Sequence, residues 1–244
     1  MKKEIVVLLI LSGCGSSFQQ KKKIAQSHYR QASLEVREYQ EKENVNSLRK
    51  ALNEIEKAIE IHQTSHALGL KGTILLQLGC IDQSKQEIKE SLPYFERVFK
   101  DKNTTKARRA DAKNNYATAL YQLGKNKEAI AIWNELKTNS HYISPEVAFF
   151  NLGYAELNEA IRLQQQKNDS KEAEHHLENA VTCFRQSLAV SKEYIDALLF
   201  LTQALVGLKK LTEAHDTCLT ILTINPDHQT ALRWLKNIEE RLNK

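Results

Sequence analysis

Histidine and cysteine are the most versatile chemical groups in this 244-residue chain, and their spacing is unfavourable for catalysis or metal binding. His62 and His66 are four residues apart, but the Thr-Ser pair between them is typical of a connection between helices. His175 and His176 are adjacent and would point in different directions from a helix. No Gly-rich phosphate loop, His-Glu-x-x-His motif or nucleophile elbow is present. We therefore expect no enzyme activity, no metal and no cofactor.

Three cysteines in the body of the chain, Cys80, Cys183 and Cys218, lack the paired Cys-x-x-Cys spacing of zinc and redox sites. Three is also an odd number for a disulfide framework. We expect buried free thiols at helix-packing positions. The alternative is a Cys183–Cys218 disulfide, since both residues would lie on neighbouring helices.

The fourth cysteine, Cys14, has a different setting. Residues 5–11 form an uninterrupted apolar run, which is too short to cross a hydrocarbon core of about 30 Å but has the length of a signal-peptide hydrophobic region. The run ends in Leu11-Ser12-Gly13-Cys14, which resembles a bacterial lipobox. That resemblance implies lipid transfer to the Cys14 thiol, cleavage before Cys14 and acylation of the new amino terminus. The alternative is an ordinary signal peptide with a chance cysteine.

The lipobox resemblance predicts the organisation of the whole chain. Residues 1–13 would be a lipoprotein signal peptide, residues 14–23 a lipidated amino terminus and tether, and residues 24–244 the folded domain. Stable attachment requires more than one acyl chain, which a triacylated Cys14 would supply. Gly15 resembles the pattern that sends lipoproteins of enteric-type bacteria to the outer membrane. We therefore expect a lipid-anchored protein of the cell envelope that faces the periplasm.

The remaining sequence repeats with the period of a helical array. Glycine (8) and proline (3) are scarce and 41% of residues are apolar, which favours an all-α fold. Ala180 and Ala214 are 34 residues apart, which is the tetratricopeptide (TPR) period. The clearest unit, residues 114–130, contains a glycine at 124 that can end one helix and a Glu128-Ala129 pair that can open the next.

These repeats predict an all-α TPR superhelix, an α-solenoid of five helical hairpins with a C-terminal capping helix. The predicted pairs span 24–63, 65–100, 108–142, 146–192 and 195–228, and the capping helix spans 229–243. Extra residues near 162–172 should lengthen both helices of the fourth pair. We also expect Pro93 to interrupt a helical stretch and residues 100–105 to form a loop.

A stack of such hairpins exposes the first helix of each pair on one side, where a partner polypeptide can bind. Side-chain amides there can hydrogen-bond a peptide backbone, and tyrosine and phenylalanine supply apolar area at little entropic cost. The expected groove residues are Asn114, Asn115, Thr118, Tyr121, Phe150, Asn151, Tyr154, Leu157, Leu199 and Gln203. The alternative is that the aromatic residues belong to the core.

The formal charge of +5 arises from 35 basic and 30 acidic residues that are mixed along the chain. Such mixing is typical of a solvated helical surface, so we expect no nucleic-acid partner. Two short basic clusters stand out, Lys21–Lys23 and Lys106–Arg109. The first follows the predicted anchor and is either a solvated linker or a contact for anionic head groups.

Three segments in the middle of the chain resemble the type IV pilus pilotin family. They are the Asn-Asn-Tyr helix that starts at Asn114, the connection His141–Glu146 with its Tyr-x-x-Pro-Glu pattern, and Asn151-Leu152-Gly153. In the family, outer-membrane lipoproteins with TPR arrays help the pilus secretin to insert and multimerise. Ala117 stands where the family commonly has glycine, and the fourth pair is longer than usual.

Together these patterns predict a membrane-anchored TPR lipoprotein that acts as a protein-binding scaffold. The resemblance implies an outer-membrane secretin as the partner and pilus biogenesis as the process. The alternative is a general periplasmic scaffold for envelope enzymes or chaperones. In either case we expect a protein partner and no small-molecule substrate.

Overall fold

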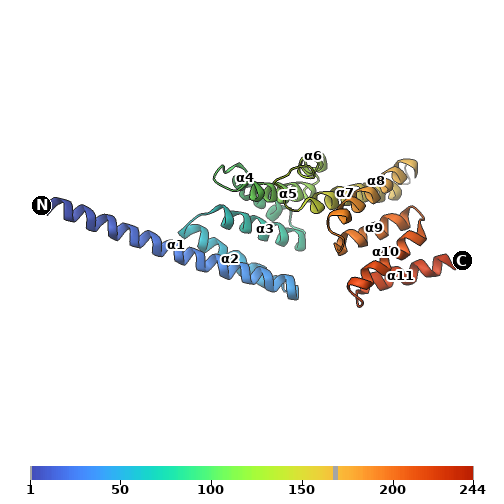
Figure 1. Ribbon diagram of the computed structural model, residues 1–244, viewed down its shortest axis with the longest axis horizontal. Helices are drawn as coiled ribbons and strands as arrows, with labels where there is room; N and C mark the ends of the chain where they lie inside the picture. The colour runs from blue at the N-terminus through green and yellow to red at the C-terminus, as the bar shows by residue number, and fades with distance from the viewer. Residues whose placement is uncertain (1, 167–169, 244) are drawn as a thin grey trace. The chain divides into compact units, whose positions relative to one another are not determined.

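The computed structural model describes residues 2–166 and 170–243, which form α-helices joined by short connections (Figure 1). In chain order the helices are α1 (Lys2–Lys42), α2 (Val45–Ile61), α3 (Ser65–Ile81), α4 (Lys85–Lys100), α5 (Lys106–Gln122), α6 (Asn126–Leu136), α7 (Pro145–Gln165), α8 (Ser170–Val190), α9 (Ile195–Gly207), α10 (Leu211–Ile224) and α11 (Gln229–Leu242).

The chain divides into two compact units, residues 1–125 with α1 to α5 and residues 126–244 with α6 to α11. In the first unit α1 packs on α2 and α3 on α4; in the second α7 packs on α8 and α9 on α10. Each second helix of a pair also contacts the first helix of the next pair, as α4 does with α5 and α8 with α9. This serial packing of helical hairpins is the TPR arrangement. The predicted all-α TPR fold is confirmed.

Side chains and one glycine set the helix ends. The hydroxyl groups of Thr64, Ser84 and Thr105 accept hydrogen bonds from backbone N–H groups in the first turns of α3, α4 and α5. At the end of α5, Gly124 has a φ of 82°, and the Lys125 N–H donates to the Leu120 carbonyl at 2.9 Å. This left-handed cap places the helix end where the sequence predicted it.

Glycine also lets the paired helices come close together. A Cβ atom at Gly72 of α3 would lie 2.8 Å from the Phe95 ring of α4. A Cβ atom at Gly153 of α7 would lie equally close, 2.8 Å, to the Phe184 ring of α8. Phe95 and Phe184 are buried, so each ring packs directly on the backbone of the facing helix. The same glycine–phenylalanine contact therefore brings the two helices of one hairpin close together in each unit.

The extra residues of the fourth pair lengthen both helices, as predicted. Helices α7 and α8 have 21 residues each, compared with 17 in α3 and 16 in α4. The prediction that Pro93 interrupts a helix is wrong, because α4 runs through it. Pro93 lies on the exposed side of α4, where the carbonyl group that loses its partner can bind water. The predicted loop before α5 is confirmed at residues 101–105.

Helix α1 begins at Lys2 and passes through the predicted signal peptide and tether. The structure describes side chains from Ser17 onward, so the Cys14 side chain lies outside the described residues. Among the described residues, no helix combines the length and apolar character that crossing a membrane requires.

The three downstream cysteines are free thiols, so the alternative of a Cys183–Cys218 disulfide is not realised. Cys218 is buried and Cys183 is half-buried, and burial raises the pKa of both thiols. The prediction of burial is wrong for Cys80, which is exposed near the end of α3. Its neighbour Gly79 faces α4, so the Cys80 side chain points away from that helix.

Candidate protein-binding surfaces

A groove of about 220 Å³ lies in the first unit, between α3 and α5 and beside α1. We call it the α3–α5 groove. Its lining residues are Tyr29 of α1, Ser65, His66, Gly69, Leu70 and Thr73 of α3, Phe95 and Val98 of α4, and Arg108, Asp111, Ala112 and Asn115 of α5. Three of these helices are the first members of their pairs, which is where a TPR array exposes a binding surface.

The α3–α5 groove combines an apolar floor with polar walls. Val98 lies beneath Gly69 and Phe95 beneath Gly72; both side chains are buried, and both line the groove. Tyr29 and His66 meet edge to face, with ring centroids 6.4 Å apart. A partner side chain can therefore contact apolar surface while its backbone meets polar groups.

Two opposite charges face this groove without a hydrogen bond or an ion pair. Among the described residues, no hydrogen bond or ion pair engages the side chain of Arg108 or Asp111, although both are half-buried on α5. Burial raises the pKa of Asp111, and the positive charge of Arg108 opposes that rise. Burial and Arg108 both lower the pKa of His66, which is therefore neutral at pH 7. The groove thus offers an acceptor, a cation and a neutral imidazole to a partner.

The predicted groove residues of α5 fall into two groups. Asn115 lines the groove, and its amide donates to the Thr73 hydroxyl at 3.4 Å. Asn114 is buried and donates to the Asn115 side-chain oxygen at 3.5 Å, so it positions Asn115 rather than meeting a partner. Thr118 donates to the Asn114 carbonyl at 3.1 Å. Thr118 and Tyr121 are half-buried, and their contact with a partner stays a prediction.

The second unit carries an aromatic cluster on the facing helices α7 and α9. Phe150 lies 5.2 Å from Tyr194 and 5.7 Å from Phe200, and Tyr154 lies 5.2 Å from Phe200, measured between ring centroids. These four rings are half-buried, while Phe184 beneath them is fully buried. Burial raises the pKa of the Tyr194 hydroxyl to about 12. The cluster therefore packs against the core and also presents ring edges at the surface.

Other predicted residues of the second unit differ in exposure. Asn151 of α7 and Leu199 and Gln203 of α9 are half-buried, so contact with a partner stays a prediction for each. The prediction for Leu157 is wrong, because this side chain is 1% exposed and belongs to the core around Phe184. It lies one turn beyond Tyr154, where α7 faces α8 and α9.

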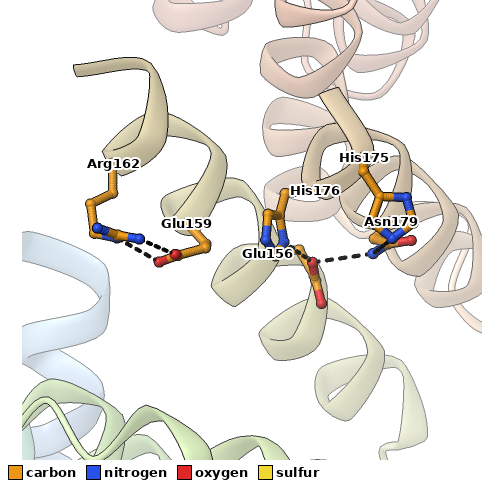
Figure 2. Close-up of polar contacts among 6 residues, drawn as sticks. All are labelled: Glu156, Glu159, Arg162, His175, His176 and Asn179. Carbon is orange, nitrogen blue, oxygen red and sulfur yellow. Dashed lines mark hydrogen bonds and ion pairs between the residues drawn. The ribbon is translucent and has the colours of Figure 1, made fainter. Parts of the chain in front are cut away.

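A polar cluster joins the lengthened helices α7 and α8 (Figure 2). His176 Nδ1 lies 2.7 Å from a Glu156 oxygen, and the Asn179 amide donates to the same oxygen at 3.4 Å. His175 instead lies beside Asn179, so the adjacent histidines take different partners. Each of these four side chains has a partner within the hairpin, and the contacts of Glu156 with His176 and Asn179 join α7 to α8.

Among the described residues, no group of three or more His, Cys, Asp or Glu side chains lies close enough together to hold a metal ion. His62 packs edge to face against Phe18, and His66 packs against Tyr29. These histidines belong to apolar contacts between α1 and the connection from α2 to α3.

No family model and no curated protein matches the chain. Among solved structures, it resembles PilW, a widely conserved type IV pilus biogenesis factor, with a TM-score of 0.59 and 18% identity over 90% of this chain and 92% of that chain. PilF of Pseudomonas aeruginosa gives a TM-score of 0.56 and 18% identity over 91% and 87%. MamA of Desulfovibrio magneticus RS-1 gives 0.50 and 15% over 81% and 97%. At these identities the likeness establishes the fold.

Proposed function

We propose that the chain is a membrane-anchored TPR lipoprotein that binds another polypeptide and assists assembly of a type IV pilus secretin. The observation that carries the binding role is the α3–α5 groove, where unpaired Arg108 and Asp111 flank an apolar floor. A half-buried charge is only partly hydrated, so a partner that donates hydrogen bonds to Asp111 and accepts them from Arg108 would stabilise both groups.

The pilus assignment rests on two kinds of similarity. The segments around Asn114, His141 and Asn151 resemble the pilotin family. The fold is similar to those of PilW and PilF, over nine-tenths of this chain in each case. A helical-repeat binding surface is not specific to pilus proteins, so a general envelope scaffold is the competing function.

Deletion of the gene tests the pilus role. We expect the secretin to accumulate as monomers in the deletion strain, and a plasmid copy of the wild-type gene should restore multimers. A plasmid copy with Asn115→Ala and Arg108→Ala should restore fewer multimers at equal protein level, because the groove loses an amide and its unpaired cation. Normal secretin multimers in the deletion strain would rule out the pilus role and favour the general scaffold.

The lipid anchor has its own test. Replacing Cys14 by Ser removes the thiol to which the lipobox resemblance assigns the lipid, so the variant should lose incorporation of labelled palmitate. We also expect it to leave the outer-membrane fraction. Continued palmitate labelling of the Cys14→Ser variant would contradict lipidation at this residue.

A further inference from the structure

One end of the first unit brings together three segments that are distant in sequence. Phe18 of α1 lies edge to face against His62 after α2, with centroids 5.7 Å apart. A cavity of about 270 Å³ joins Lys22 and Gln26 of α1 to His62 and to the start of α3. The Ser65 hydroxyl donates to Asp101, in the connection from α4 to α5, at 2.5 Å. The middle of α1 and two connections therefore form one continuous end of this unit.

That end is strongly basic. Between residues 97 and 113 there are seven basic and two acidic residues, an excess equal to the formal charge of the whole chain, +5. Arg97 and Lys100 line a second cavity of about 580 Å³ together with Ser65 and Asp101, which places them beside the same connection. We define the basic end as Lys21, Lys22, Lys23, Arg97, Lys100, Lys102, Arg108 and Arg109.

Acidic groups neutralise little of this charge. Lys100 pairs with Glu96, and Asp101 accepts hydrogen bonds from Ser65, Thr104 and the backbone of Asn103. Arg109 interacts electrostatically with Asp101, but in the part of the chain that the structure describes no salt bridge engages Arg97, Lys102 or Arg109. Helix α5 also lacks an acidic residue in its first turn, where the helix dipole favours one. Positive charge is therefore present at the start of α5, although it interacts unfavourably with the positive end of the helix dipole.

Helix α1 continues past this end toward the amino terminus. Because Phe18 lies against the residue that follows α2, residues 2–17 extend beyond the last turn of α2. Phe18 is 52% exposed and Ile24 is 43% exposed, which places large apolar side chains among the lysines of α1. Position 14 is four residues before Phe18, about 6 Å along a helix axis.

From these positions we propose that the basic end binds the anionic head groups of a phospholipid bilayer. The proposal rests on the proposed membrane attachment of the chain and adds an orientation to it. A chain held at position 14 would bring Lys21 to Lys23 and the start of α5 toward the bilayer surface. Each basic side chain near an anionic surface strengthens binding several-fold at low salt. Exposed Phe18 and Ile24 can enter the head-group region.

An acidic polypeptide is the competing ligand, but the position of the charge favours a bilayer. The basic residues lie at the end from which α1 leaves the unit, and α1 leads to the segment that carries the predicted anchor. Only Arg108 belongs both to the basic end and to the α3–α5 groove. The basic end is therefore mostly separate from the surface proposed for a protein partner.

Vesicle binding by the purified full-length chain tests the proposal. The two vesicle types are pure phosphatidylcholine and a mixture with about one third phosphatidylglycerol. Binding to neutral vesicles measures the contribution of apolar residues, so the ratio of the two affinities isolates the charge effect. We expect at least tenfold tighter binding to the anionic vesicles at about 0.1 M salt, and loss of that preference near 1 M salt, where charges are screened.

Two triple variants provide the contrast. The first variant should lose most of the preference for anionic vesicles; it combines Arg97→Gln, Lys102→Gln and Arg109→Gln. The second variant loses the same charge from exposed positions elsewhere in the unit and should keep the preference; it combines Lys50→Gln, Lys85→Gln and Lys89→Gln. Equal loss in both variants, or a wild-type chain without preference, would overturn the proposal; the second result would favour an acidic polypeptide. Neither result depends on lipidation of Cys14, so failure here is distinct from failure of the anchor.

Discussion

At the scale of single residues, an unusual feature of this protein is a half-buried carboxyl group without a hydrogen bond or ion pair. Asp111 on α5 has neither among the described residues, and burial raises its pKa above the usual 3.8, although the charge of Arg108 opposes the rise. A raised carboxyl pKa means that the folded chain binds the proton more tightly than the unfolded chain. Ionised Asp111 therefore lowers stability at neutral pH, and the cost disappears once the pH falls below 3.8.

Asp111→Asn should accordingly stabilise the protein at pH 7. We expect a rise in Tm of about 1 °C, since a half-exposed site contributes a few tenths of a kcal/mol. Thermal unfolding of both proteins at pH 7 and near pH 3 measures the effect, which should vanish at the lower pH. A variant that is less stable than wild type at pH 7 would show that the carboxylate has a stabilising partner.

Glu54 of α2 differs from Asp111 in that its pKa is lowered by its contacts. The hydrogen bond from Lys57 and that with His28 of α1, 2.7 Å long, lower the pKa of Glu54 from its usual 4.5. A lowered carboxyl pKa contributes stability above 4.5, which is lost as the pH falls through the folded-state pKa. Glu54→Gln should therefore destabilise the protein by about 0.5 to 1 kcal/mol at pH 7.

The loss in Glu54→Gln should be smaller near pH 3 than at pH 7, because a growing fraction of the wild-type carboxyl is protonated as the pH falls. Denaturant unfolding at the two pH values gives the comparison. Glu60→Gln is the control, since Glu60 is exposed on the same helix and forms no ion pair or hydrogen bond with the described residues. An equal loss in both variants would mean that the contact with α1 contributes nothing.

The sequence predicted groove residues only in part, because period alone does not distinguish a groove position from a core position. Asn115 was identified from its type and place in the repeat, and it lines the groove. Leu157 was placed there by the same counting, yet it is a core residue. Arg108 was noted only as part of a short basic cluster. The signal that could have found it is its spacing from Asp111 and Asn115 on one face of α5.

At the scale of helices, close packing of the two helices of a hairpin depends on glycine where a phenylalanine ring of one helix meets the backbone of the other. Gly153→Ala would place a methyl group 2.8 Å from the buried Phe184 ring, which must then shift within a packed core. Overpacking of this kind costs about 1 to 3 kcal/mol. We expect Tm to fall by several degrees in thermal unfolding followed by circular dichroism.

Gly69→Ala is the matched control for Gly153→Ala. Its new Cβ atom would meet only Val98, at 3.9 Å, which is an ordinary contact. Because alanine favours a helix over glycine by up to about 1 kcal/mol, this variant should be as stable as wild type or more stable. Destabilisation of similar size in both variants would show that helix packing at Gly153 is not the cause.

Helix positions followed well from the sequence because the signals there are local. Gly124 predicted the end of α5, and the extra residues near 162–172 predicted two longer helices. The prediction for Pro93 was wrong because the effect of a proline depends on whether it lies on the side of α4 that faces water. The sequence period alone did not show which side Pro93 occupies. The basic end was predicted only as two separate clusters, Lys21–Lys23 and Lys106–Arg109, because its residues come from three segments that only the fold brings together.

At the scale of the whole molecule, the chain divides into two compact units at Lys125. The boundary falls inside the predicted third pair, between α5 and α6. Repeat arrays gain stability from each hairpin and from its nearest neighbours, so a local defect should weaken nearby helices most. This differs from a globular domain, in which one cooperative core makes a defect felt everywhere.

Hydrogen exchange of two variants, one in each unit, distinguishes these cases. Gly72→Ala forces a methyl group to 2.8 Å from Phe95, the same distance that Gly153→Ala creates at Phe184. We expect Gly72→Ala to speed amide exchange mainly in α2 to α5, and Gly153→Ala to speed it mainly in α6 to α9, as measured by mass spectrometry of peptides. The two variants act as controls for each other because the chemical change is identical. Equal acceleration in all helices for both variants would mean that the chain unfolds as one cooperative unit, and the local model of repeat stability would then not apply to it.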